Sequence, residues 1–163
     1  MNEKDSTHDS REMPHTHLLH LLLPIIFIAV WVLDSWILLL SVWLNEFIPL
    51  ILRIILFITV LGLALIVMFL SHRTLFDHNE PSDTLITSGI LNRVRNPLYL
   101  SILLIYIAIL LLSISIISIV LFIIIFFVYN KMVNYEEKKL EEIFGNEYLE
   151  YKKKVPKWIP KLF

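Results

Sequence analysis

Apolar residues in this chain fall into three long runs separated by short polar segments. The first two runs extend from about residue 18 to 44 and from about residue 47 to 70. Each exceeds the roughly 20 residues that a helix needs to cross about 30 Å of hydrocarbon. Because residues 45–49 are a short link, the pattern predicts two antiparallel transmembrane helices over residues 18–70.

The third apolar run, residues 98–128, contains no charged residue, no Gly and no Pro. Its roughly 31 residues would form about 46 Å of helix, too long for one upright span and short for two full ones. Three serines near its middle allow a tight turn. We therefore predict a hairpin of two short helices at about 97–112 and 115–131, followed by an amphipathic, basic tail from residue 134.

Composition and charge support a membrane protein. Hydrophobic residues make up 57% of the 163 and charged residues only 18%, a balance typical of polytopic membrane proteins. Four crossings place the N-terminus, residues 71–95 and the tail on one side, which then holds every Lys and Arg except Arg53. The positive-inside rule assigns that side to the cytosol. We predict an all-α integral membrane protein with four transmembrane helices and both termini in the cytosol.

The same organisation predicts a single domain, residues 1–163. A polar N-terminal tail (1–17) precedes the first helical hairpin (18–70), and residues 71–163 supply a polar loop, the second hairpin and a C-terminal segment. Asp34 and Arg53 would lie inside the first two helices, where charged groups are costly. We expect them to form a structural ion pair, with contact between Arg53 and a lipid head group as the alternative.

Several kinds of function are excluded or disfavoured by composition. Without cysteine there is no thiolate metal site and no cysteine nucleophile. A net charge of −1 supplies no field to recruit nucleic acid, three glycines cannot form a Gly-rich nucleotide loop, and no obligate protein partner is evident. Four N-terminal histidines are expected to belong to a solvated, interfacial segment rather than a metal site: His8, His15, His17 and His20.

Two polar blocks flank the third apolar run. The first, residues 83–99, reads D-T-L-I-T-S-G-I-L-N-R-V-R-N-P-L-Y, and the second, residues 136–156, reads E-E-K-K-L-E-E-I-F-G-N-E-Y-L-E-Y-K-K-K-V-P. Each piece has an ordinary structural interpretation: Asn96 and Pro97 suit a helix start, and Gly145 suits a helix end. If both blocks serve one site, the chain must cross the membrane and return between them.

Together and in this order, the blocks resemble the integral membrane methyltransferases, the family of isoprenylcysteine carboxyl methyltransferase and the phospholipid methyltransferases. The resemblance covers residue 83 to about 160, roughly half of the chain. It implies an S-adenosylmethionine site on the cytosolic side, completed by the C-terminal tail. It also implies methyl transfer to a lipophilic acceptor that enters from the bilayer, either a prenylcysteine carboxylate or a phospholipid amine.

The resemblance also implies roles for particular residues. A carboxylate and aromatic rings suit a sulfonium cation, so Glu136, Asn96 and Tyr99 are the expected catalytic residues, with Glu136 orienting the cofactor. Expected cofactor contacts are Asp83, Thr84, Leu85, Ile86, Leu91, Asn96, Pro97, Leu98, Tyr99, Glu136 and Glu137. Expected acceptor contacts are Arg93, Arg95, Lys131 and Met132, and no metal is expected. A protonated amine acceptor would need a base, with Glu137 or Tyr99 as candidates.

Three positions depart from the carboxyl methyltransferase pattern. Asn96 replaces a His and Leu91 replaces a Tyr. Met132 replaces an Arg that contacts the substrate, and a Lys one position away does not replace a bidentate Arg. This departure weakens the prenylcysteine interpretation most. Two alternatives remain: a membrane reductase of the sterol reductase type that uses NADPH, and a non-catalytic scaffold with a degenerate site. Binding of S-adenosylmethionine would separate the methyltransferase from both.

Overall fold

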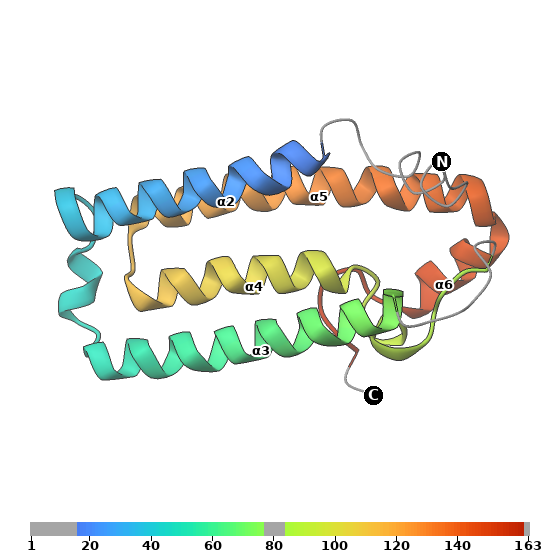
Figure 1. Cartoon of the computed structure of the whole chain (residues 1–163), viewed down its shortest axis with the longest axis horizontal. Helices are drawn as coiled ribbons and strands as arrows, with labels where there is room; N and C mark the ends of the chain where they lie inside the picture. The colour runs from blue at the N-terminus through green and yellow to red at the C-terminus, as the bar shows by residue number, and fades with distance from the viewer. Residues whose placement is uncertain (1–15, 77–83, 162–163) are drawn as a thin grey trace.

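The computed structural model describes residues 16–76 and 84–161, and within these ranges every regular element is helical. The apolar helices lie alongside one another and alternate in direction, with α2 beside α5 and α3 beside α4 (Figure 1). A last helix folds back at the end of α5. The helices are α2 (Thr16–Val32), α3 (Leu50–Phe76), α4 (Pro97–Leu112), α5 (Ile116–Phe144) and α6 (Asn146–Lys154).

Within the described ranges, three segments are long and apolar enough to cross a membrane by length and composition: Thr16–Leu38, Leu50–Leu75 and Ile116–Phe144. The fourth apolar helix, α4, has 16 residues, which make about 24 Å and fall short of about 30 Å of hydrocarbon. The prediction of an all-α, multi-pass membrane protein is confirmed. That α4 forms a fourth complete crossing stays a prediction.

The first hairpin differs from the prediction at its turn. The first helix was predicted to continue to residue 44, but its α-helical part ends at Val32 and a π-helical turn follows over Leu33–Leu38. Leu39 then adopts a left-handed conformation with φ of 52°. The connection to α3 is therefore longer than the five-residue link that hydrophobicity predicts, and it is built around one buried side chain.

That side chain is Asp34, which is 3% exposed. Its carboxylate accepts the backbone N–H groups of Leu40 and Ser41 at 3.1 Å each, and the Ser41 and Ser115 hydroxyls also donate to it. These bonds curl the chain back over the end of the helix. Arg53 donates to two backbone carbonyl groups instead. The predicted Asp34–Arg53 ion pair is therefore wrong.

The second hairpin begins as predicted, because α4 spans Pro97–Leu112. A short turn follows, and the Ser115 side chain accepts the Ser118 N–H at 3.0 Å to cap the start of α5. The Trp31 indole N–H of α2 donates to the Ser113 carbonyl at 3.0 Å and holds this turn against the first hairpin. Hydrogen bonds of the serines therefore stabilise the turn that the sequence predicted.

The end of this hairpin differs from the prediction. A tail was predicted to start at residue 134, but α5 continues to Phe144 and carries the acidic pair on a continuous helix. Residues 132–144 contain no Gly or Pro and many strong helix formers. Gly145, with φ of 54°, ends the helix. The basic Lys152–Lys154 run then forms the last turn of α6.

The buried core lies where α2, α4 and α5 meet. Phe27 packs edge-on against Tyr106 with ring centroids 4.7 Å apart, and Tyr129 and Met132 are completely buried beside them. By contrast, many large apolar side chains of α2 and α3 stay exposed. Such a continuous apolar exterior is expected where lipid, rather than water, surrounds the helices.

Candidate functional site

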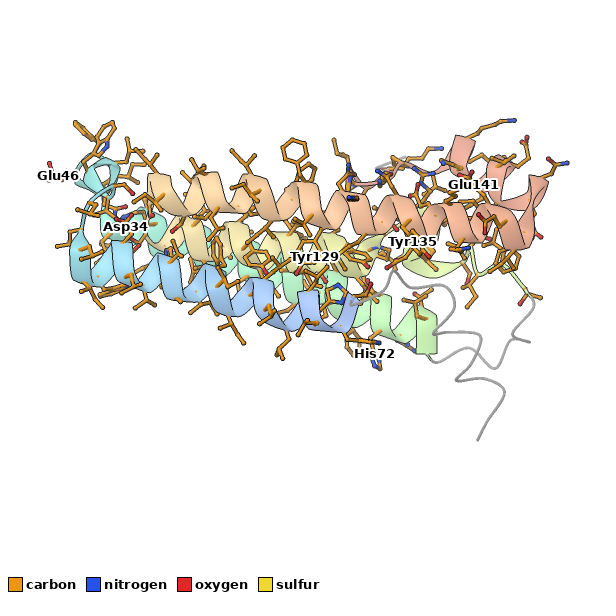
Figure 2. All side chains as sticks on the ribbon, turned by 90° about the horizontal axis from the view of Figure 1, so that it is seen from above. Asp34, Glu46, His72, Tyr129, Tyr135 and Glu141 are labelled. Atoms are coloured by element: carbon orange, nitrogen blue, oxygen red, sulfur yellow. The ribbon has the colours of Figure 1, made fainter. Side chains whose placement is uncertain are left out.

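The candidate site lies at the end of the bundle where α2 and α4 begin and α3 ends (Figure 1). Figure 2 shows Tyr135, Glu141 and His72 toward this end, whereas Asp34 and Glu46 lie at the opposite end. The loop before α4, the last turns of α5 and the C-terminal segment meet here. The chain therefore crosses the bundle and returns between the two polar blocks, as one shared site requires.

Backbone hydrogen bonds join the two blocks directly. The Arg95 N–H donates to the Pro156 carbonyl at 3.0 Å, and the Lys161 N–H donates to the Arg93 carbonyl at 2.8 Å. These bonds attach the C-terminal segment to the loop that leads into α4. Residues more than 60 positions apart in sequence are therefore held together at the site.

Gly89 sets how closely the loop approaches α3. Its φ is +59°, a conformation that side chains rarely adopt, and a Cβ there would lie 2.6 Å from the Thr74 Oγ1 atom. A larger residue would both strain the backbone and push the loop away from the helix. The close approach therefore depends on glycine at this position.

The two residues of the acidic pair, Glu136 and Glu137, lie in different environments. Glu137 is 3% exposed, and its Oε1 atom accepts the Asn96 amide N–H at 2.8 Å and lies 3.5 Å from an Arg95 Nη2 atom. The Lys152 ammonium lies 3.8 Å from the other carboxylate oxygen. Glu136 instead accepts the Tyr99 hydroxyl. Consecutive helical residues point about 100° apart, so the two carboxylates face different surroundings.

Asn96 has a different role from the one that its position suggests. It directly precedes α4, where an Asn commonly caps the helix with its side chain. Here the side chain makes no capping bond and binds Glu137 across the site instead. Asn96 therefore links the loop before α4 to α5.

A pocket of about 240 Å³ opens between these elements. Its walls come from the end of α3, the loop, the first turn of α4, the C-terminal part of α5, and α6. Most of the predicted cofactor contacts lie in these walls. They are Thr84, Leu85, Ile86, Leu91, Asn96, Pro97, Leu98, Tyr99 and Glu136.

Other predicted residues lie elsewhere. Asp83 is outside the described residues. Glu137 is not part of the pocket wall and lies behind it among its polar partners. Of the predicted acceptor contacts, Arg95 lines the pocket, whereas Arg93 and Lys131 are exposed outside it. Met132 is completely buried in the hydrophobic core.

The structure adds wall residues that sequence reasoning did not assign. Tyr148 and Tyr151 form the Tyr-x-x-Tyr motif of the second block, and this motif could have identified them as pocket residues. Leu75 comes from the end of α3 and had no signal, because its position depends on how α3 packs against the loop. The added residues are Leu75, Leu140, Phe144, Tyr148 and Tyr151.

The two pocket-lining tyrosines of α6 are neutral. Burial raises the pKa of Tyr151 to about 12. Burial and the nearby Glu137 carboxylate also raise the pKa of Tyr148. The Tyr151 hydroxyl donates to the Leu91 carbonyl at 2.6 Å and ties α6 to the loop. Both rings therefore offer uncharged surfaces at physiological pH.

Arg95 has unused binding capacity. Its side chain is 8% exposed, and one nitrogen, Nη2, faces Glu137. Its buried Nε and Nη1 atoms have no hydrogen-bond partner in the part of the chain that the structure describes. Buried donors without partners cost free energy, so such a site favours a ligand that accepts them. A carboxylate or phosphate matches the fork of a guanidinium.

Comparison with protein families identifies one matching model, described as phospholipid methyltransferase, which covers residues 47–147. The match includes α3, the loop, α4 and all of α5, well over half of the chain. Comparison with curated proteins gave no significant match, and neither did comparison with solved structures.

Proposed function

The chain belongs to the phospholipid methyltransferase family, whose members are membrane enzymes that use S-adenosylmethionine, and from that premise we propose that the pocket beside Glu136 holds this cofactor. Family membership implies methyl transfer at a membrane, and it favours this activity over the reductase and the scaffold. We further propose that the methyl acceptor is the amine of a phospholipid head group. The observation that carries the cofactor proposal is the pocket that both polar blocks line together.

The pocket has the donors and acceptors that this cofactor needs. Arg95 offers two buried donors for the carboxylate of the methionine part. The Glu136 carboxylate and the Tyr99 ring suit a cation, which fits the sulfonium and the ammonium. Apolar and aromatic residues of the loop, α5 and α6 offer surfaces for the adenine ring.

S-adenosylmethionine supplies an electrophilic methyl group on a positively charged sulfur. The contributions of the protein are alignment and exclusion of water, which methyl transfer requires more than acid or base groups. Tyr99 donates to Glu136 and holds its carboxylate in one orientation. Asn96 and Arg95 hold Glu137, which keeps the loop against α5. We assign Glu136 and Tyr99 to cofactor contact, and Asn96 to positioning as well as to the pocket wall.

The acceptor proposal rests on charge. A carboxylate acceptor would approach the Glu136 carboxylate and would need a cationic clamp. The position where carboxyl methyltransferases place that clamp is Met132, which is completely buried in the core. An ammonium head group meets the opposite situation, because Glu136 attracts it. Arg93 and Lys131, both exposed outside the pocket, are then available for the lipid phosphate.

We also propose that this end of the bundle faces the cytosol. Among the described residues, every Lys and Arg except Arg53 belongs to a segment at or toward the site end of the bundle. These segments are the end of α3, the loop before α4, the C-terminal half of α5, and the C-terminal segment with α6. The positive-inside rule supports that orientation. The cofactor would then enter from the cytosol and the lipid from the bilayer.

The test is calorimetric binding of S-adenosylhomocysteine to the detergent-purified protein. We expect micromolar binding by the wild type and at least about a tenfold loss in Glu136→Ala, a change of about 1.4 kcal/mol or more. Glu142→Ala is the matched control, because this exposed glutamate lies on the same helix outside the pocket. Absence of binding by folded wild-type protein, or equal binding by the two variants, would contradict the assignment.

A further inference from the structure

A second cavity, of about 210 Å³, lies between α2, α4 and α5. Its wall is formed mainly by apolar side chains of α2 and α4, together with one imidazole, from His20, and two phenols, from Tyr106 and Tyr129. A mainly apolar cavity between membrane helices fits a lipid chain better than a polar ligand. Among these polar groups, His20 lies nearest the start of its helix and so marks where a head group would approach.

His20 connects this cavity to the cofactor pocket. Its ring lies 5.5 Å from the ring of Tyr99 and 5.7 Å from that of Tyr129, measured between centroids. Tyr99 lines the cofactor pocket and donates to Glu136 there. Tyr129, labelled in Figure 2, lies where α5 faces α2. The expectation of a solvated N-terminal histidine segment is therefore wrong for His20.

The depth of His20 suits a head group. It is the fifth residue of α2 and Tyr99 is the third of α4, and both helices begin at the site end of the bundle. At 1.5 Å per residue, His20 is only about 6 Å from the start of its helix. A lipid chain in the second cavity can therefore have its polar end beside both His20 and the cofactor pocket.

We propose that His20 takes the proton from the ammonium group of a phospholipid acceptor whose chain lies in the second cavity. The proposal rests on the proposed function. It concerns a residue outside the matched range 47–147, so no family assignment bears on it.

The reaction needs this step because an ammonium nitrogen has no lone pair. The imidazole lone pair takes one proton from the head group, which leaves a neutral amine and an imidazolium. The amine nitrogen then attacks the methyl carbon, so that an N–C bond forms while the S–C bond breaks and its electron pair stays on sulfur. The imidazolium returns its proton to water before the next turnover. The products are a methylated ammonium lipid and a thioether.

The surroundings of His20 suit a transient positive charge. The rings of Tyr99 on α4 and Tyr129 on α5 lie against it, and aromatic faces stabilise cations. Tyr106 of α4 also lines the cavity, and its hydroxyl lies 3.4 Å from that of Tyr129. The Glu136 carboxylate accepts the hydroxyl of Tyr99, whose ring lies against His20.

The two base candidates from the sequence are less well placed. Glu137 lines neither cavity and is held by Asn96, Arg95 and Lys152. The Tyr99 hydroxyl is committed as a donor to Glu136. An imidazole, by contrast, ordinarily exchanges its proton near pH 6.5, where the head group of an amine lipid is protonated.

The test uses full-length protein in vesicles that contain phosphatidylethanolamine, with methyl-labelled S-adenosylmethionine, from about pH 5 to about pH 9. We expect His20→Gln to lower the rate about 100-fold near neutral pH. The deficit should shrink as pH rises, because a growing fraction of the amine is then neutral without a base. Affinity for S-adenosylhomocysteine should stay at the wild-type value. His17→Gln, an exposed histidine of the same helix, is the control and should match the wild type.

An unchanged rate in His20→Gln, or a deficit that is equal at every pH, overturns the proposal. If His20→Gln does not fold, the test is the pH titration of the His20 imidazole in the wild type, followed by nuclear magnetic resonance. A ring that stays neutral down to about pH 5 would be too weak a base and also overturns it. If the wild type binds S-adenosylhomocysteine but does not methylate the amine lipid, both the proposed acceptor and the proposed role of His20 as base are wrong. Protein that does not bind it overturns the proposed function itself.

Discussion

The two ends of the bundle each bury a carboxylate, but they bind it in different ways. Asp34 and Glu137 are both 3% exposed. The donors to Asp34 are neutral: two serine hydroxyls and two backbone N–H groups. The partners of Glu137 are a side-chain amide and two cations, Arg95 and Lys152.

The difference separates a structural cluster from a binding site. Around Asp34, the donors converge on the carboxylate and connect the turn after α2 to the start of α5. At the other end, Arg95 gives only part of its guanidinium to Glu137 and keeps Nε and Nη1 without partners among the described residues. A guanidinium that keeps unpaired donors beside a pocket can bind a ligand, whereas a carboxylate whose acceptor sites are occupied by protein donors stabilises the fold.

The largest effect should come from removing the carboxylate at the site end. Glu137→Ala leaves the buried guanidinium of Arg95 without its counter-charge, and breaking such a pair costs about 3–5 kcal/mol. We expect a marked drop in the thermal midpoint, measured by tryptophan fluorescence in detergent, and weaker binding of S-adenosylhomocysteine.

Glu137→Gln is the matched control, because it keeps the shape and an acceptor for Asn96 while it removes the charge. Its midpoint should fall between those of the wild type and Glu137→Ala. Equal midpoints for wild type and Glu137→Ala would show that the buried pair contributes nothing to stability.

At the opposite end the effect should be smaller and confined to stability. Asp34→Asn weakens the bonds from the Ser41 and Ser115 hydroxyls and turns an amide toward donors. We expect a loss of about 1–3 kcal/mol in the free energy of unfolding. Affinity for S-adenosylhomocysteine should equal that of the wild type. A clear change in that affinity would mean that the two ends are coupled and that the comparison fails.

Much of the site could be predicted because its residues are contiguous in sequence. The loop, Asn96 and the start of α4 at Pro97 follow directly from one polar block, and proline determines where the helix begins. The apolar runs likewise indicated the four helices, because hydrophobic length is a strong local signal.

What could not be predicted depends on contacts between distant segments. Ser115 meets Asp34 only after the two hairpins pack together, and Ser41 reaches it only because the chain curls back after α2, so a simple Asp34–Arg53 pair was expected instead. The unpaired Nε and Nη1 atoms of Arg95 among the described residues result from its position between α5 and the C-terminal segment. His20 gave no periodic or motif signal, and its contact with Tyr99 arises from tertiary packing alone.

The smallest expected effect concerns the bond between α6 and the loop. Tyr151→Phe removes the hydroxyl that donates to the Leu91 carbonyl, which costs about 0.5–1.5 kcal/mol and weakens S-adenosylhomocysteine binding a few-fold. The pKa of Tyr151 is about 12 in the folded protein, above the ordinary value of 10, because the ring is buried. The folded state therefore holds this proton more tightly than the unfolded state does. Its contribution to stability is complete below about pH 10 and is lost as the pH rises toward about 12. The stability difference between wild type and Tyr151→Phe, measured by thermal denaturation, should therefore shrink across that range, and a constant difference would place the hydroxyl in water.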